Sequence, residues 1–182
     1  MRGSVAACVV CLIVICAFSG WKAYYGEEQL LMAVSNRNVR TSRYLIGFGV
    51  NVNCESRNGL TPLHIAAGHY YKPKTKSLIP TSGPRGRGSL RSPSVELVHI
   101  LLNSGARVNV RNNQGWTPLH AAGGYGDMAV VSILVRAGAD PSMSDNDGTT
   151  TLDWALKNAS NKHLGGKAQK NCKLVAEFLQ NR

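Results

Sequence analysis

The sequence repeats itself at a fixed spacing, and this periodicity constrains the fold more than any other feature. The segment NGLTPLHIAAG at 58–68 returns as QGWTPLHAAGG at 114–124. A weaker copy, DGTTTLDWALK, lies at 147–157, and the segment at 25–35 keeps only the apolar residues. One leucine slot recurs with two equal intervals and a longer one between them: Leu30, Leu63, Leu119 and Leu152. Such a period indicates a stack of similar units that bury their apolar faces against one another.

A second marker follows the same spacing. Gly49, Gly105 and Gly138 each follow an apolar run. The spacing from Gly49 to Gly105 equals that from Leu63 to Leu119, and the spacing from Gly105 to Gly138 equals that from Leu119 to Leu152. We expect Gly105 and Gly138 to end helices in the left-handed conformation. Because both markers agree, the second unit is a repeat of about 33 residues that carries about 23 extra residues, at roughly 70–92.

Local signals place helices and turns within each unit. Thr61-Pro62 and Thr117-Pro118 predict helix starts, because Thr can cap a helix and Pro needs no donor in the first turn. Apolar runs near 95–102 and 130–135 predict second helices that bury one side. The polar stretches predict hairpin tips: 53–59, 109–115 and 142–148.

This pattern resembles the ankyrin repeat. The resemblance rests on residues 59–67 and 115–123 and on the runs that follow the pattern V-x-x-L-x-x-x-G-A. It covers residues 26–182. It implies an all-α repeat solenoid, an ankyrin-like stack of about four helix-turn-helix units with short β-hairpin tips. The units expected within the domain 26–182 are 26–58, 59–114, 115–147 and 148–182.

The last unit departs from the repeat pattern. Thr151-Leu152-Asp153 replaces the expected Pro-Leu-His, and about eleven extra residues, NASNKHLGGKA or nearby, precede CKLVAEFLQ. We interpret this unit as a terminal cap with a more polar outer side.

The resemblance implies a non-catalytic module that binds a protein partner on the concave face formed by tips and first helices. We expect a monomer and no cofactor. Trp116, Tyr125, Arg57 and Arg111 form the predicted hot spot, because aromatic side chains and Arg dominate binding energies; alternatively, Trp116 only packs on the neighbouring tip. The full predicted partner-binding set is Arg57, Asn58, Leu60, Arg111, Asn113, Gln114, Trp116, Tyr125, Asn146 and Asp147.

Catalytic and metal sites are not predicted. His64 and His120 occupy the same repeat slot, where the resemblance implies a structural bond to the preceding Thr and to the neighbouring unit. No Ser/His/Asp, HExxH or paired-carboxylate arrangement stands out in the sequence. We therefore expect that the protein is not an enzyme.

The insertion is basic. The chain carries 21 Lys and Arg against 10 acidic residues, and the insertion has no acidic residue. Its Pro- and Gly-rich composition predicts an exposed loop, which is either a tolerated insertion or a binder of nucleic acid or anionic lipid. The basic residues predicted to act there are Lys72, Lys74, Lys76, Arg85, Arg87 and Arg91.

The N-terminus predicts a signal peptide or membrane anchor at 1–19, followed by a linker at 20–25. Arg2 precedes an uncharged apolar run from Val5 to Phe18, the length of a signal-peptide core, and cleavage before Gly20 fits the small residues there. The expected location is the secretory pathway or the exterior. The alternatives are an anchor through residues 5–21 or an intracellular protein, as is usual for ankyrin-like domains.

The intact mass of the protein purified from cells tests the leader. We expect a mass that lacks residues 1–19, recovered in the lumenal or secreted fraction. A full-length mass in the membrane pellet would indicate an anchor instead, and a full-length soluble protein would contradict both interpretations.

Overall fold

The computed structural model describes residues 26–68, 93–161 and 166–181. The predicted leader, the 20–25 linker and the basic insertion at 70–92 lie outside these ranges. No helix in the described ranges has both the length and the apolar character needed to cross a membrane. The same ranges contain eight helices: α2 (Glu27–Ser35), α3 (Val39–Gly47), α4 (Pro62–Ala66), α5 (Pro93–Asn103), α6 (Pro118–Tyr125), α7 (Met128–Arg136), α8 (Thr151–Ala159) and α9 (Gly166–Gln180).

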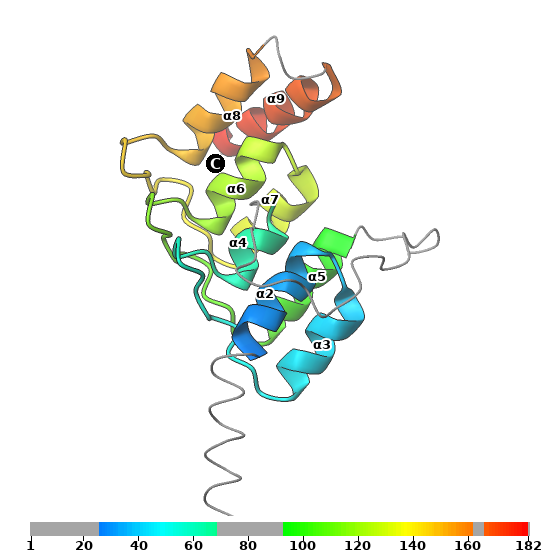
Figure 1. Cartoon of the computed structure of the whole chain (residues 1–182). Coiled ribbons are helices and arrows are strands. Elements are labelled where there is room, and N and C mark those ends of the chain that lie inside the picture. The colour runs from blue at the N-terminus through cyan, green and yellow to red at the C-terminus, as the bar shows by residue number, and fades with distance from the viewer. Residues whose placement is uncertain (1–25, 69–92, 162–165, 182) are drawn as a thin grey trace, which may run out of the picture.

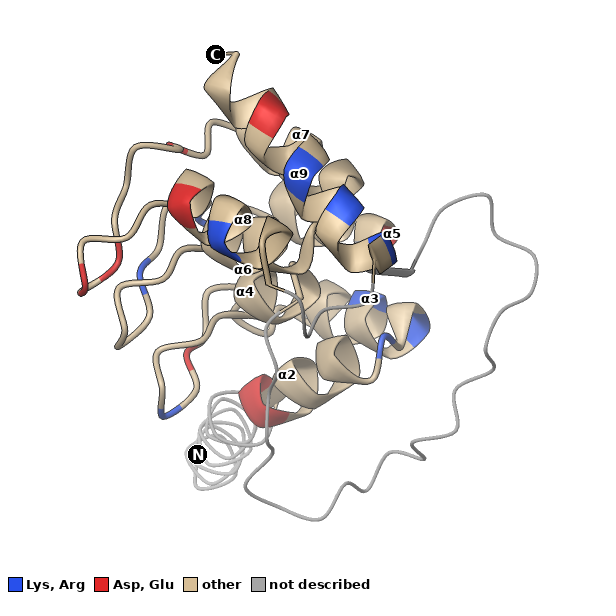
Figure 2. Ribbon diagram, turned by 90° about the horizontal axis from the view of Figure 1, so that it is seen from above, with Lys and Arg blue, Asp and Glu red and all other residues tan. Residues whose placement is uncertain are grey.

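The helices form four pairs stacked in two layers (Figure 1). The first helices α2, α4, α6 and α8 pack against one another in sequence, and α3, α5, α7 and α9 form the second layer. The turns between pairs project together from one side of the stack, as the view from above in Figure 2 shows. The predicted all-α repeat solenoid is confirmed.

The predicted helix boundaries are correct in the two closest repeats. Thr61 and Thr117 are the N-caps of α4 and α6, each with Pro at the first helical position. Gly105 and Gly138 follow α5 and α7 with φ of 86° and 90°. Since the next residue in each case donates its N–H back to a carbonyl near the helix end, these glycines close the helices as expected.

Apolar side chains from both layers form one continuous core. Leu30, Leu63 and Leu119, which share the repeated slot, are 0% exposed. The first helices also approach one another closely, because a Cβ at Gly123 would clash with the Cγ2 atom of Thr151 on α8. Each unit therefore depends on its neighbours for burial, as the periodicity predicted.

Two buried histidines connect consecutive units. His64 Nδ1 accepts the Thr61 N–H at 3.2 Å, and Nε2 lies 2.9 Å from the carbonyl oxygen of Trp116 in the next tip. His120 repeats both contacts, accepting from the Thr117 N–H at 3.1 Å and reaching the carbonyl oxygen of Thr149 at 3.2 Å. An imidazole that accepts at Nδ1 and donates from Nε2 is neutral. The predicted structural role of these residues is confirmed.

The last unit replaces this histidine with Asp153. Its Oδ2 accepts from the Thr150 N–H at 2.9 Å and the Thr150 hydroxyl at 2.6 Å, which caps α8. These hydrogen bonds from Thr150 lower the pKa of the carboxyl group. A carboxylate cannot donate as His Nε2 does, and no later unit follows in the described chain to offer a carbonyl.

The extra residues of the last unit are not all an insertion between helices. α8 extends to Ala159, and α9 already begins at Gly166 and runs for 15 residues. Residues 158–159 and 166–168 of the predicted insertion are therefore helical, which corrects the sequence-based interpretation. The long α9 covers the end of the core with buried Cys172, Val175 and Ala176.

Protonation of His120 should destabilise the fold. Burial lowers the pKa of this imidazole from 6.5, although the Thr149 carbonyl and the Asp145 carboxylate oppose the shift. The unfolded chain therefore binds more protons between the folded-state pKa and about 6.5, and stability is lost as pH falls through that window.

Urea unfolding at pH 7.5 and 5.5 measures this effect. We expect a lower urea midpoint at pH 5.5 and a smaller difference between the two pH values in His120→Gln. An equal pH difference in both proteins would contradict the prediction.

Candidate protein-interaction surface

The tips share one construction. A polar side chain at the first turn position accepts the backbone N–H groups two and four residues later. Ser56 Oγ accepts at 3.3 and 3.0 Å, Asn112 Oδ1 accepts both at 2.9 Å, and Asp145 Oδ1 accepts at 3.0 and 2.9 Å. Sequence reasoning missed this role, although these three positions keep the same spacing as the glycine markers of the repeat.

The tips are closed by turns and not by extended strands. The turn N–H groups bond back across each tip, from Ser56 to Leu60, from Asn112 to Trp116 and from Asp145 to Thr149. Within the described ranges the only strand-like pairing is an antiparallel bridge between Ser144 and Thr150. The predicted β-hairpin tips are thus tight hydrogen-bonded turns.

Asparagines join consecutive tips into a ladder. The Asn113 N–H donates to the Asn58 carbonyl oxygen at 3.1 Å, and its side-chain amide donates to the Arg57 carbonyl oxygen at 3.1 Å. Asn146 does the same one unit later, to Gln114 and Asn113, both at 3.0 Å. These side chains lie on the predicted face, but their polar atoms hold the tips together.

Other predicted residues point outward from this ladder. Arg57, Gln114 and Asp147 are exposed, and in the described part of the chain their side chains form no hydrogen bond or ion pair. Arg111 is exposed and donates to Asn146 Oδ1 at 3.2 Å. Figure 2 shows basic and acidic positions interspersed along the tips. We call Arg57, Gln114 and Asp147 the outward tip residues.

Trp116 packs on the neighbouring unit. Its ring meets the Trp154 ring edge-on with centroids 4.9 Å apart, and the Lys157 Nζ lies 4.9 Å from the centroid of Trp154. Trp116 is half-buried, and its ring also stacks near His120 at 6.5 Å. The alternative interpretation of Trp116 as a packing residue on the next unit therefore has direct geometric support.

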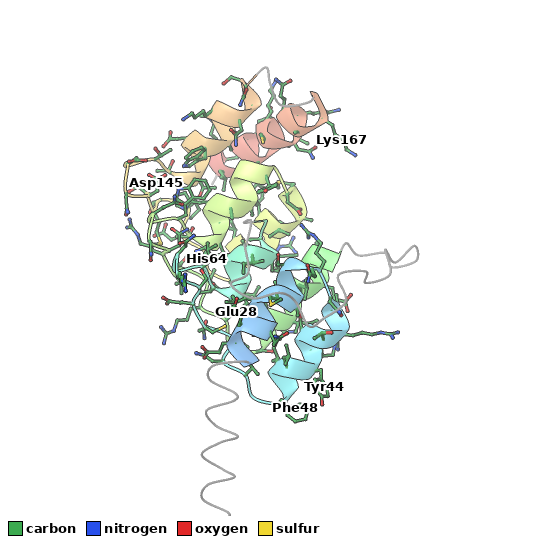
Figure 3. All side chains as sticks on the ribbon, in the orientation of Figure 1. Glu28, Tyr44, Phe48, His64, Asp145 and Lys167 are labelled. Carbon is green, nitrogen blue, oxygen red and sulfur yellow. The ribbon has the colours of Figure 1, made fainter. Side chains whose placement is uncertain are left out.

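The carboxylate of Asp145, which Figure 3 labels, holds one ring of this aromatic pair through a hydrogen bond. Asp145 is 4% exposed, and its Oδ2 accepts from the Trp154 indole N–H at 2.9 Å. Burial alone would raise the pKa of Asp145, but hydrogen bonds from Trp154 and from the N–H groups of Thr149 and Asp147 lower it. Asp145 is therefore ionised at neutral pH and serves as a structural acceptor.

Two predicted contact residues lie elsewhere. Leu60 is 3% exposed and belongs to the core, so its assignment to the binding face is wrong. Tyr125 is 63% exposed but lies at the far end of α6 from the tips, about 10 Å along the helix from Pro118. It lines a 410 Å³ cavity with Gly68, Asp127 and Asn171. The structure does not bring Tyr125 together with Arg57 and Arg111.

The thiols of the described chain are poorly suited to nucleophilic chemistry. Cys54 is buried, and burial together with the charge of Glu27 raises its pKa to about 12. Burial also raises the pKa of Cys172. Both thiols therefore stay protonated at neutral pH, whereas the thiolate is the reactive form. Among described residues, no group of three or more His, Cys, Asp and Glu side chains could hold a metal ion.

Comparisons with known proteins agree with this geometry. Family models of ankyrin repeats match residues 30–71 and 89–174. The putative ankyrin repeat protein FPV031 of fowlpox virus is 32% identical over 149 residues, covering 71% of this chain and 44% of the relative. Ankyrin repeat domain-containing protein 63 of mouse is 31% identical, covering 71% and 29%. This chain thus spans less than half of either relative.

A third relative is the probable 26S proteasome regulatory subunit p28 of Saccharomyces cerevisiae. It is 31% identical over 152 residues, covering 76% of this chain and 64% of the relative. The likeness extends across most of this chain.

Replacing Asp145 with Asn tests the carboxylate. The amide can still accept the two tip N–H groups, as Asn112 does, but its NH₂ group would face the Trp154 indole N–H. We expect a loss of about 1.5–3 kcal/mol in the free energy of unfolding by urea titration.

Trp154→Phe provides the matched control, because it removes the indole donor. The Asp145→Asn/Trp154→Phe double variant should lose less than the sum of the single variants. Strict additivity would show that the two side chains do not interact as described.

Proposed function

This chain belongs to the ankyrin-repeat family, whose members are generally protein–protein interaction modules, and from that premise we propose that it is a non-catalytic adaptor. Its partner would be a protein bound on the concave side of the stack, where tips and first helices meet. The buried, protonated thiols and the structural histidines of the described repeats support a binding role over a catalytic one.

The observation that carries this proposal is that some polar side chains of the tips join neighbouring tips while others face outward. Asn113 and Asn146 use their amides to lock one tip to the next, so the ladder is held in place before any partner arrives. Binding then costs less ordering entropy than binding by a flexible loop. The outward tip residues supply a cation, an amide and an anion on this rigid frame.

Mixed charge suits a polar protein surface. Arg57 and Asp147 lie on the first and third tips with Gln114 on the second, so a partner must present complementary groups in the same order. Electrostatic complementarity of this kind favours specificity and association rate over raw affinity. Trp116 contributes less directly, because its ring is already packed against Trp154.

The triple variant Arg57→Ala/Gln114→Ala/Asp147→Ala tests the surface. We expect at least about a tenfold loss of affinity for a partner identified by affinity capture, because a hot-spot side chain contributes more than about 1 kcal/mol. Thermal unfolding should be nearly unchanged, since these side chains are exposed.

Arg136→Ala is the matched control. This exposed arginine lies in the last turn of α7, in the second helix layer, and its removal should leave partner affinity unchanged. Unchanged affinity in the triple variant, or equal losses in both proteins, would rule out the tips as the contact surface.

A further inference from the structure

The second helix of the first unit carries an exposed stripe. Arg40, Tyr44 and Phe48 follow one another at four-residue intervals, so they lie along one side of α3 and its C-terminal cap. Tyr44 is 63% and Phe48 43% exposed, and their ring centroids are 4.6 Å apart. We call these three residues the α3 stripe.

The surroundings of the α3 stripe are positively charged. Residues 37–48 contain Arg37, Arg40 and Arg43 and no acidic residue. Arg43 pairs with Glu96 of α5 at 3.2 Å, and Arg37 lines the cavity beside Tyr125, whereas Arg40 forms no ion pair within the described ranges. The α3 stripe thus combines two exposed aromatic rings with the unneutralised guanidinium group of Arg40.

The α3 stripe lies at one end of the stack, away from the proposed protein-binding tips. Figure 3 shows Tyr44 and Phe48 below α3 at the lower end of the molecule, while α8 and α9 form the upper end. The apolar run Val5–Phe18 precedes this end in the sequence, separated from Gly26 by residues 19–25. A connection of this length can span at most about 25 Å.

The size of the patch argues against a second copy of the chain as its occupant. An aromatic side chain buries about 150–250 Å² when fully covered, so rings that are 63% and 43% exposed offer roughly 200 Å² together. A stable dimer needs about 800 Å² from each partner. The exposed area of the two rings is therefore too small to hold two copies of the chain together by itself, but it is sufficient for a shallow contact with a surface.

We propose that the α3 stripe docks on the surface of an anionic lipid bilayer. Tyr and Phe would enter the interfacial layer, where aromatic rings are favoured, and Arg40 would contact anionic headgroups. The choice of lipid over nucleic acid as the anionic partner rests on the anchor interpretation of residues 5–21, because a bilayer that holds this run also lies within reach of unit 1. The contact would orient the stack and leave the tips facing away.

The experiment uses the full chain with two kinds of vesicle, phosphatidylcholine alone and phosphatidylcholine mixed with phosphatidylserine. Lipids brominated on their acyl chains quench a nearby tryptophan. This readout reports where a residue sits even if the N-terminal run also inserts. Phe48→Trp places a probe in the α3 stripe, and Tyr125→Trp places one at an exposed aromatic position in unit 3.

We expect brominated lipid to quench the added emission of Phe48→Trp in phosphatidylserine vesicles and to leave that of Tyr125→Trp unchanged. Adding Arg40→Ser should weaken the quenching interaction about fivefold, since each basic residue near such a surface contributes about that factor. Arg136→Ser, an exposed arginine on α7, should have no effect.

Three outcomes would overturn the proposal. They are no quenching at position 48, equal quenching at positions 48 and 125, or a response that Arg40→Ser and Arg136→Ser change equally. A Tyr44→Ser/Phe48→Ser variant that loses binding to a captured protein but still sediments with anionic vesicles would assign the stripe to a protein partner. In that case the vesicle contact would fall to the N-terminal apolar run or to the basic loop at 72–91.

Discussion

The structure depends on a neutral imidazole placed between two repeats. In units 2 and 3 the histidine accepts from the backbone of its own Thr cap and donates to a carbonyl in the next tip. One side chain therefore fixes both the start of its own helix and the position of the following unit in the stack. Buried groups of this kind must find both partners, because an unpaired one costs about 1–3 kcal/mol. These paired contacts favour a single register for the stack.

That register decides what the tips can do. Because the histidines set the spacing, each tip meets the next closely enough for asparagine amides to join them, and the polar side chains at 56, 112 and 145 close each turn from within. On the predicted face, the side chains of Arg111, Asn113 and Asn146 form hydrogen bonds within this ladder. The few side chains that remain outward lie on a frame that is already rigid, which suits selective protein recognition.

The units at the two ends of the described stack depart from the repeat. Asp153 caps its helix as the histidines do but cannot donate to a following carbonyl, and the long α9 covers the end of the described core. At the other end, α5 is the second-layer helix that packs against α3 among the described helices, and Tyr44 and Phe48 are exposed. The two ends of the stack therefore differ in chemistry: a polar cap at one, and an aromatic, basic surface at the other.

The sequence by itself determined the stack of repeated units and the helix starts at Thr61 and Thr117, because these follow from a fixed period and local caps. The all-α fold and the structural role of His64 and His120 followed from the resemblance to ankyrin repeats. Only the tertiary structure decided which of the predicted contact residues face outward. Leu60 lies in the core, Trp116 packs against Trp154, and Tyr125 lies at the far end of α6. Exposure depends on what the neighbouring repeat places beside a residue, and such contacts join positions a whole repeat or more apart in the sequence. Periodicity reveals that a neighbour exists, but the packing of that neighbour sets which atoms remain free to bind.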